Sequence, residues 1–216
     1  MPGRATPLVN GELYHLFNRG VEKRDIFLQS REYIRFRQTF YYYQFQEPKP
    51  RFSNLSKNKL KNFRLSKETK LVEIICYCLM PNHFHFLVRQ LKAKGISIFL
   101  SQVSNSYTKY FNTKYKRVGP LFQGAFKSVR IETDEQLIHV SRYIHLNPIV
   151  AQMVKSLDDY PWSSYHEYIY GASGVCVTAD VLGFFKSKER YKQFLEDQIT
   201  YGITLEKAKH QLIDLV

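Results

Sequence analysis

The sequence contains 216 residues, a length typical of one domain or of one domain with an extension. Its 44% hydrophobic and 24% charged residues are typical of a globular protein and exclude a disordered chain. No apolar run approaches the roughly 20 residues of a membrane span, and the N-terminal segment MPGRATPLVNGEL lacks the apolar core of a signal peptide. We therefore expect neither secretion nor membrane insertion, and a cytoplasmic location.

The charge predicts a polyanionic partner. Lysine and arginine number 32 against 19 acidic residues, which gives a net charge of +13 and a pI near 9.6. The simpler interpretation is a merely basic surface. However, the 16 tyrosines and 16 phenylalanines often lie beside cations, as they do between residues 107 and 117. Cations hold phosphates while rings stack on unpaired bases, so the combination favours single-stranded nucleic acid, although most rings are expected in the core.

The chain contains only three cysteines, and two of them, Cys76 and Cys78, alternate along a predicted strand. Alternation places both on one face of the strand, where we expect them to be buried. An odd number without a zinc-binding spacing predicts buried thiols in a reducing compartment.

The first half of the chain predicts a strand, a helix and a loop. Residues 12–19 form a strand that ends at Gly20, and residues 30–46 form a helix, because aromatic residues recur there at spacings of three and four. Residues 47–70 are rich in lysine, arginine, serine and asparagine, with two prolines, so they predict a loop or insertion. This segment is either a solvated spacer, which we favour slightly, or a basic arm that contacts a nucleic-acid backbone.

The central part predicts a hairpin followed by a helix and a further strand. Residues 71–79 and 83–90 are rich in strand-forming residues, and Met80-Pro81-Asn82 supplies the turn between them. Residues 96–116 carry apolar residues at helical spacing, and residues 121–131 can form another strand after the Gly119-Pro120 break.

A further helix is predicted over residues 134–147, capped by Thr133 or Asp134 and stopped by Pro148. The order of elements predicts an α+β fold with a ferredoxin-like (split βαβ) antiparallel sheet, plus this added helix. Residues 186–201 and 206–216 predict two more helices. We therefore predict a domain over residues 1–170 and a C-terminal helical extension over residues 171–216.

Two local patterns are candidates for chemistry, and the first is His83-Phe84-His85. On a strand, His83 and His85 project from one face while Phe84 packs on the other. Two adjacent imidazoles make half of a divalent-metal site. The alternative is a pair of histidines that merely covers the sheet. A cupin-type metal site would need a glutamate a few residues later, but the next acidic residue is Glu132.

The second pattern lies on the predicted helix 134–147, where His139, Tyr143 and Asn147 are spaced by four residues and share one face. Aromatic residues on helices usually pack, but Tyr143 falls on the polar side of this helix. It lies one turn from Asn147, an amide whose oxygen can bind a metal ion.

These two patterns and three further motifs resemble those of a known family. Met80-Pro-Asn-His-Phe-His85 resembles the histidine–hydrophobe–histidine (HUH) motif of single-tyrosine transposases of the IS200-like type, and Tyr143-Ile-His-Leu-Asn147-Pro148 resembles their tyrosine helix. Three other segments resemble the REP-associated tyrosine transposase branch: Tyr14-His-Leu-Phe-Asn-Arg-Gly20, Phe122-Gln-Gly-Ala-Phe-Lys-Ser128 and Tyr160-Pro-Trp-Ser-Ser-Tyr165. The resemblance covers roughly residues 10–170, with the 47–70 insertion and the tail as departures.

The resemblance implies a metal-dependent transposase that cleaves and rejoins single-stranded DNA near REP-like hairpins. A divalent ion, Mg²⁺ or Mn²⁺, would be held by His83, His85 and Asn147, and Tyr143 would attack the DNA to give a 5′-phosphotyrosine. A DNA substrate of this kind predicts a nucleoid-associated protein, either a monomer or a homodimer. Four cations at strand ends or on a predicted strand are candidates for positioning the DNA backbone: Arg19, Arg89, Lys127 and Arg130.

Two alternatives remain open at this point. A non-catalytic hairpin-binding or single-strand-binding protein, such as a domesticated transposase or repressor, would bind DNA in the same salt-sensitive way without cleaving it. A metal-dependent hydrolase that uses water would need acidic ligands near the histidines, and the sequence shows none there. His139, one turn before Tyr143, is a candidate proton acceptor, with a structural or solvent-facing role as the favoured alternative.

Overall fold

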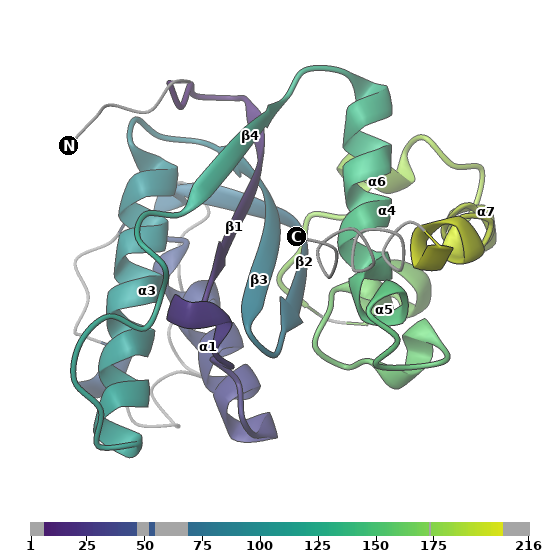
Figure 1. The fold of residues 1–216 in the computed structure, drawn as a ribbon. Helices are drawn as coiled ribbons and strands as arrows, with labels where there is room; N and C mark the ends of the chain where they lie inside the picture. Colours follow the sequence, from purple (N-terminus) through teal and green to yellow (C-terminus); the bar gives the residue numbers. More distant parts are fainter. Residues whose placement is uncertain (1–6, 47–51, 55–68, 173, 205–216) are drawn as a thin grey trace, which may run out of the picture. The chain divides into compact units, whose positions relative to one another are not determined.

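The computed structural model describes residues 7–46, 52–54, 69–172 and 174–204 of the chain (Figure 1). Four strands form one sheet in the order β2-β3-β1-β4. The strands are β1 (Leu13–Arg19), β2 (Val72–Met80), β3 (His83–Gln90) and β4 (Lys127–Ile131). The β2–β3 hairpin, with β1 beside β3 and β4 beside β1, is the antiparallel arrangement of a ferredoxin-like sheet, so the predicted α+β class is confirmed.

The chain divides into two compact units, and the division passes through β2 and β3. The first unit contains β1, β4 and the helices α1 (Ser30–Tyr43) and α3 (Gly95–Lys114), together with residues 81–83 and 88–90. The second contains residues 74–80 and 84–87 and the helices α4 (Asp134–Val150), α5 (Tyr165–Tyr170), α6 (Ala179–Leu182) and α7 (Lys188–Glu196). Short 3-10 helices cover Val21–Lys23, Phe52–Asn54 and Leu157–Asp159.

The core of the first unit is aromatic, and α1 lies beside α3 there (Figure 1). The Phe36 ring meets the Tyr107 ring edge-on at 4.9 Å, and Phe27 stacks on Tyr33 at 4.6 Å. Tyr107 is fully buried and donates a hydrogen bond to the Ile26 carbonyl at 2.5 Å. Burial raises the pKa of its phenol far above the ordinary value. These four aromatic side chains therefore pack in the core, which is the role expected from the sequence for most of the rings.

In the second unit, the buried strand β2 receives hydrogen bonds from tyrosines of later segments. Tyr168 donates to the Ile75 carbonyl at 2.9 Å, and both ring and strand are buried. Cys76 and Cys78 are fully buried, as predicted, and burial raises the pKa of both thiols.

The element boundaries differ from the predictions at several ends. The first helix ends at Tyr43 and α3 ends at Lys114, while β4 begins only at Lys127. The segment before β4 instead contributes an isolated bridge between Phe122 and Gly20. The prediction for Thr133 is confirmed, because its side chain accepts a hydrogen bond from the Gln136 amide and caps α4.

The prediction that Pro148 stops the helix at residue 147 is wrong. Helix α4 continues to Val150 with Pro148 inside it. Proline removes the N–H that would have donated to the Ile144 carbonyl, and its ring crowds that carbonyl, but the helix extends only two residues beyond it. The last turn is completed by hydrogen bonds from the Ala151 amide to the Asn147 carbonyl and from the Met153 amide to the Pro148 carbonyl, both 2.9 Å.

Several predictions fall partly or wholly outside the described residues. Most of the 47–70 insertion and the predicted helix over residues 206–216 lie outside them, and the predicted domain boundary at residues 170–171 stays a prediction. Helix α7 lies within the predicted 186–201 helix. In the part of the chain that the structure describes, no helix combines the length and apolar character needed to cross a membrane.

Phe84→Ala should lower the free energy of unfolding by about 3–5 kcal/mol, because the side chain is fully buried and its loss leaves a cavity. Its ring lies 5.2 Å from that of Phe86. Urea unfolding followed by circular dichroism measures the change. Phe184→Ala, at a ring that is 49% exposed, is the matched control and should shift stability by no more than about 0.5 kcal/mol. Equal midpoints for the two variants would contradict the burial of Phe84.

Candidate functional site

Strand β3 carries the two imidazoles identified from the sequence. Its side chains alternate, so His83 and His85 leave one face and Phe84 and Phe86 leave the other. Both phenylalanines are fully buried, whereas His83 is half-buried and His85 is 5% exposed. The buried phenylalanines anchor the strand, so the two imidazoles project from a rigid backbone.

Helix α4 brings Tyr143 next to His85 within the second unit. The centroids of the two rings lie 5.4 Å apart with their planes at 84°, an edge-on contact. Tyr143 is nevertheless 51% exposed, which is unusual for a tyrosine on a helix that buries Ile144 and Leu146. The phenol is thus held beside an imidazole and still reachable from solvent.

Asn147 follows one turn later on the same helix. Its Nδ2 donates a hydrogen bond to the Tyr143 carbonyl at 2.7 Å. A carbonyl can only accept, so this bond shows that the NH₂ group of the Asn147 amide, rather than its oxygen, faces the Tyr143 carbonyl. The amide oxygen, Oδ1, is therefore the group of Asn147 that can accept a hydrogen bond or coordinate a cation.

The donor types of His83, His85 and Asn147 fit a divalent cation. Imidazole nitrogen and amide oxygen are ordinary ligands of divalent first-row metals. All three are neutral donors, so an ion bound to them would keep its charge for an anionic substrate. Within the described segments, no group of three or more His, Cys, Asp and Glu side chains is arranged to hold a metal ion. The set of His83, His85 and Asn147 stays a prediction from the sequence.

The four cations predicted to bind DNA all lie in the first unit. Arg19 donates to the Gln123 side chain at 2.5 Å, Arg130 pairs with Glu12 at 3.1 Å, and Arg89 lies 3.6 Å from Glu73. Lys127 is exposed. Partly exposed ion pairs such as those of Arg89 and Arg130 stabilise a fold little, so these two arginines can exchange a carboxylate for a phosphate at small cost.

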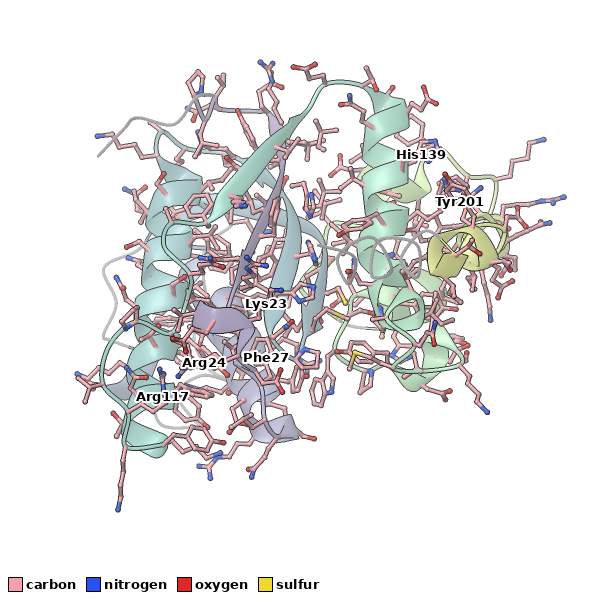
Figure 2. The ribbon with its side chains drawn as sticks, viewed as in Figure 1. Lys23, Arg24, Phe27, Arg117, His139 and Tyr201 are labelled. Atoms are coloured by element: carbon pink, nitrogen blue, oxygen red, sulfur yellow. The ribbon has the colours of Figure 1, made fainter. Side chains whose placement is uncertain are left out.

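Figure 2 shows His139 on α4, where it contacts two side chains of the same helix and the Phe194 ring of α7. Arg142 donates to its Nδ1 at 2.6 Å, and its Nε2 lies 3.8 Å from a Glu135 oxygen. These contacts favour the structural interpretation of His139 over the role of proton acceptor for Tyr143.

Sequence reasoning missed a buried polar network centred on His145. The ring lies between Tyr191, whose hydroxyl is 2.8 Å from Nδ1, and Ser164, whose hydroxyl is 2.7 Å from Nε2. Ser164 also accepts a hydrogen bond from the Tyr77 amide of β2 at 2.9 Å. Burial lowers the pKa of His145 to about 3, so the ring is neutral at pH 7. The Ser163-Ser164 pair was the available sequence signal, but nothing in the sequence linked it to α4.

Three comparisons relate this chain to known proteins. Residues 48–147 match the family described as Transposase IS200 like. A curated protein of Haemophilus influenzae, named as a REP-associated tyrosine transposase, is 27% identical over 105 residues, covering 44% of this chain and 59% of that protein. The chain thus matches less than two thirds of that relative's length. A solved structure of a REP-associated tyrosine transposase bound to a REP hairpin superposes with a TM-score of 0.59 at 17% identity, covering 84% of this chain and 93% of the other.

Stability should fall between pH 7 and pH 5 because of His145. Its pKa is about 3 in the folded protein and near 6.5 when unfolded, so the unfolded state binds more protons in this range and stability rises with pH. This group alone should cost about 2 kcal/mol at pH 5 relative to pH 7. Urea unfolding at both pH values measures it, with His145→Gln as the variant that cannot titrate. An equal pH dependence in the variant would contradict the assignment.

Proposed function

We propose that this chain, which is similar to the IS200-like transposases, cleaves and rejoins single-stranded DNA next to hairpins through a 5′-phosphotyrosine on Tyr143. One observation carries the proposal: a half-exposed tyrosine meets a strand histidine edge-on, with an amide one helical turn away. The transposase likeness of residues 48–147 supports it. The chemistry, the metal and the strandedness of the DNA are our inference.

Tyr143 is preferred to Tyr107 and Tyr110, the two tyrosines that lie among cations on α3, because of its exposure. Tyr107 is fully buried and already donates its hydroxyl proton to the Ile26 carbonyl. The Tyr110 hydroxyl is also buried. A phosphodiester flanked by nucleotides cannot reach either oxygen, whereas 51% of Tyr143 is open to solvent. A nucleophile must reach the reacting phosphorus, so Tyr143 is the best placed of the three.

We propose that His83, His85 and Asn147 hold a divalent ion, Mg²⁺ or Mn²⁺. When bound, such an ion would polarise a phosphate oxygen and offset the negative charge that grows during attack. The chain's own contribution is orientation. The two imidazoles share one face of a continuous strand, and the bond from Asn147 to the Tyr143 carbonyl fixes the amide oxygen as a donor.

In the proposed reaction, the Tyr143 oxygen bonds to phosphorus while the bond from phosphorus to the 3′ oxygen breaks. The phenol loses its proton and the departing 3′ oxygen gains one. The new phosphodiester keeps the energy of the old one, so a 3′-hydroxyl can reverse the step and join strands without a nucleotide cofactor.

The proposed substrate is a single strand with a REP-like hairpin nearby. A solved structural neighbour binds a REP hairpin, and this chain has the same fold. Its net charge of +13 and the cations Arg19, Arg89, Lys127 and Arg130 favour phosphate contacts, which make binding strongly salt-dependent. Such DNA lies in the nucleoid, which is the location that we propose, for a monomer or a homodimer.

Tyr143→Phe should remove both cleavage and the covalent protein–DNA adduct while leaving hairpin binding unchanged, because only the attacking oxygen is deleted. Labelled hairpin-containing single strands incubated with Mn²⁺ and run on denaturing gels measure cleavage and adduct together. Tyr201→Phe is the matched control: Tyr201, which is labelled in Figure 2, is 65% exposed, and the variant should remain fully active. Hairpin binding by the wild type without any adduct would instead indicate a non-catalytic hairpin-binding protein.

His85→Ala should reduce Mn²⁺-stimulated cleavage to background, because one of two imidazole ligands is lost while the fold is kept. The same gel assay with and without Mn²⁺ measures the effect. His166→Ala is the control in the same unit, since His166 contacts the Asp158 carbonyl rather than the candidate site. Undiminished metal stimulation in folded His85→Ala protein would show that the ligand is misassigned.

A further inference from the structure

Asn82 occupies the two-residue turn between β2 and β3, directly before His83. Its side chain makes two hydrogen bonds of different kinds. Nδ2 donates to the Lys23 carbonyl at 3.2 Å, and Oδ1 lies 2.6 Å from Nδ1 of His83. The Asn82 carbonyl also accepts a hydrogen bond from the Gly20 amide at 2.8 Å. All four residues belong to the first unit.

These bonds determine which nitrogen of His83 carries the proton. The Lys23 carbonyl can only accept, so Asn82 must turn its NH₂ group toward it. The other end of the amide, Oδ1, then faces His83 and can itself only accept. Nδ1 of His83 is therefore the donor. In the neutral ring, the lone pair consequently lies on Nε2.

The backbone that receives the Asn82 amide is held in a conformation rare for its residues. Glu22 and Lys23 have φ values of 57° and 58°, the left-handed region that non-glycine residues seldom adopt. Figure 2 shows Lys23 on the segment that follows β1. Gly20 cannot be replaced there, since a Cβ atom would lie 2.2 Å from the Arg24 carbonyl oxygen. Consecutive left-handed residues persist only where the surroundings enforce them.

The surroundings that enforce this conformation come from the same turn as Asn82. The amides of Ile26 and Phe27 both donate to the Pro81 carbonyl, at 2.7 and 2.9 Å. The segment after β1 is thus fastened to Pro81 and Asn82 by four hydrogen bonds. This fastening directs the Lys23 carbonyl at the Asn82 side chain.

We propose that Asn82 is a positioning residue that fixes His83 as the Nδ1–H tautomer and so makes Nε2 its metal-binding atom. The inference rests on the proposed metal role of His83. A histidine that binds metal through one nitrogen usually donates the other N–H to an oxygen, which fixes the tautomer and the orientation of the ring. Asn82 supplies that oxygen, and the strained Glu22–Lys23 turn holds Asn82 in the orientation required.

The tautomer can be read directly in the metal-free full-length protein. Long-range ¹H–¹⁵N correlation spectra distinguish the protonated ring nitrogen from the unprotonated one, and His83→Gln identifies the His83 signals by their loss. We expect the proton on Nδ1 in the wild type. A proton on Nε2 in the folded wild-type protein would overturn the proposal, whatever its activity.

Two variants at Asn82 separate positioning from mere support of the turn. Both Asn82→Ala and Asn82→Asp lose the bond to Lys23, but only Asn82→Asp keeps an oxygen acceptor for His83. We expect Asn82→Ala to lose the Nδ1–H preference and to bind Mn²⁺ about 10–100-fold more weakly, measured by the electron paramagnetic resonance of the free ion. Asn82→Asp should keep both the tautomer and the affinity. A purely structural role predicts equal losses in the two variants, and that result would overturn the proposal.

The same measurements separate this inference from the proposed function. The tautomer is recorded without metal, DNA or cleavage, and thermal unfolding by circular dichroism confirms that each variant is folded. Positioning by Asn82 is supported if the wild-type protein has the Nδ1–H tautomer, Asn82→Asp keeps it and Asn82→Ala loses it. If that protein bound no Mn²⁺, the metal role of His83 would be the part overturned.

Discussion

The position of the α4 face that carries Tyr143 and Asn147 depends on the hydrogen bonds of the buried His145 imidazole. A polar ring without solvent must find a partner for each nitrogen, because an unsatisfied buried polar group costs about 1–3 kcal/mol. Tyr191 and Ser164 provide those partners at 2.8 and 2.7 Å. Because Ser164 is also bonded to the β2 backbone through Tyr77, the ring ties α4 to the strand next to β3.

This tie explains how a half-exposed tyrosine keeps a defined orientation. His145 lies two residues after Tyr143 and two before Asn147, on the opposite side of the helix. Its two directional hydrogen bonds oppose both rotation and sliding of α4, which apolar packing alone resists less strictly. The contact between Tyr143 and His85 at 5.4 Å is therefore set from the buried side of the helix.

Strand β3, like α4, has one face that packs in the core and one face that carries the candidate site residues. Phe84 and Phe86 fill the core and fix the path of β3, which leaves His83 and His85 on the other face. The orientation of His83 is fixed in addition by a hydrogen bond to its neighbour Asn82. The proposed nucleophile and the proposed metal ligands thus each lie one or two positions along the chain from a residue that fixes the local backbone or ring.

Much of the fold was predictable because hydrophobic period and turn residues specify local structure. The strand-forming residues of 83–90 and the turn before them predicted β3, and strand geometry predicted the common face of its histidines. The spacing of Tyr143 and Asn147 predicted their shared helical face. The end of α4 was not predictable from Pro148 alone, since amides beyond the proline complete the last turn of the helix.

The residues that hold the candidate site in place could not be predicted from sequence patterns, because their interactions are not local. His145 is satisfied by residues 19 and 46 positions away, and no local period encodes such partners. The left-handed conformations of Glu22 and Lys23 contradict the preferences of those residue types, so only the surrounding hydrogen bonds explain them. The contact of α4 with His85 likewise depends on tertiary packing.

The placement of Tyr143, His145 and Asn147 within a single stretch of α4 also restricts how the gene for such a protein can change. Each residue of an α-helix advances by about 100° around the axis, so one inserted or deleted codon between Tyr143 and Asn147 would turn one end of the stretch by that angle relative to the other. Either the phenol or the amide would then face the wrong way, or the imidazole would lose its buried partners. Substitutions are therefore tolerable at Ile144 or Leu146 when they preserve volume, whereas the length of this interval is fixed.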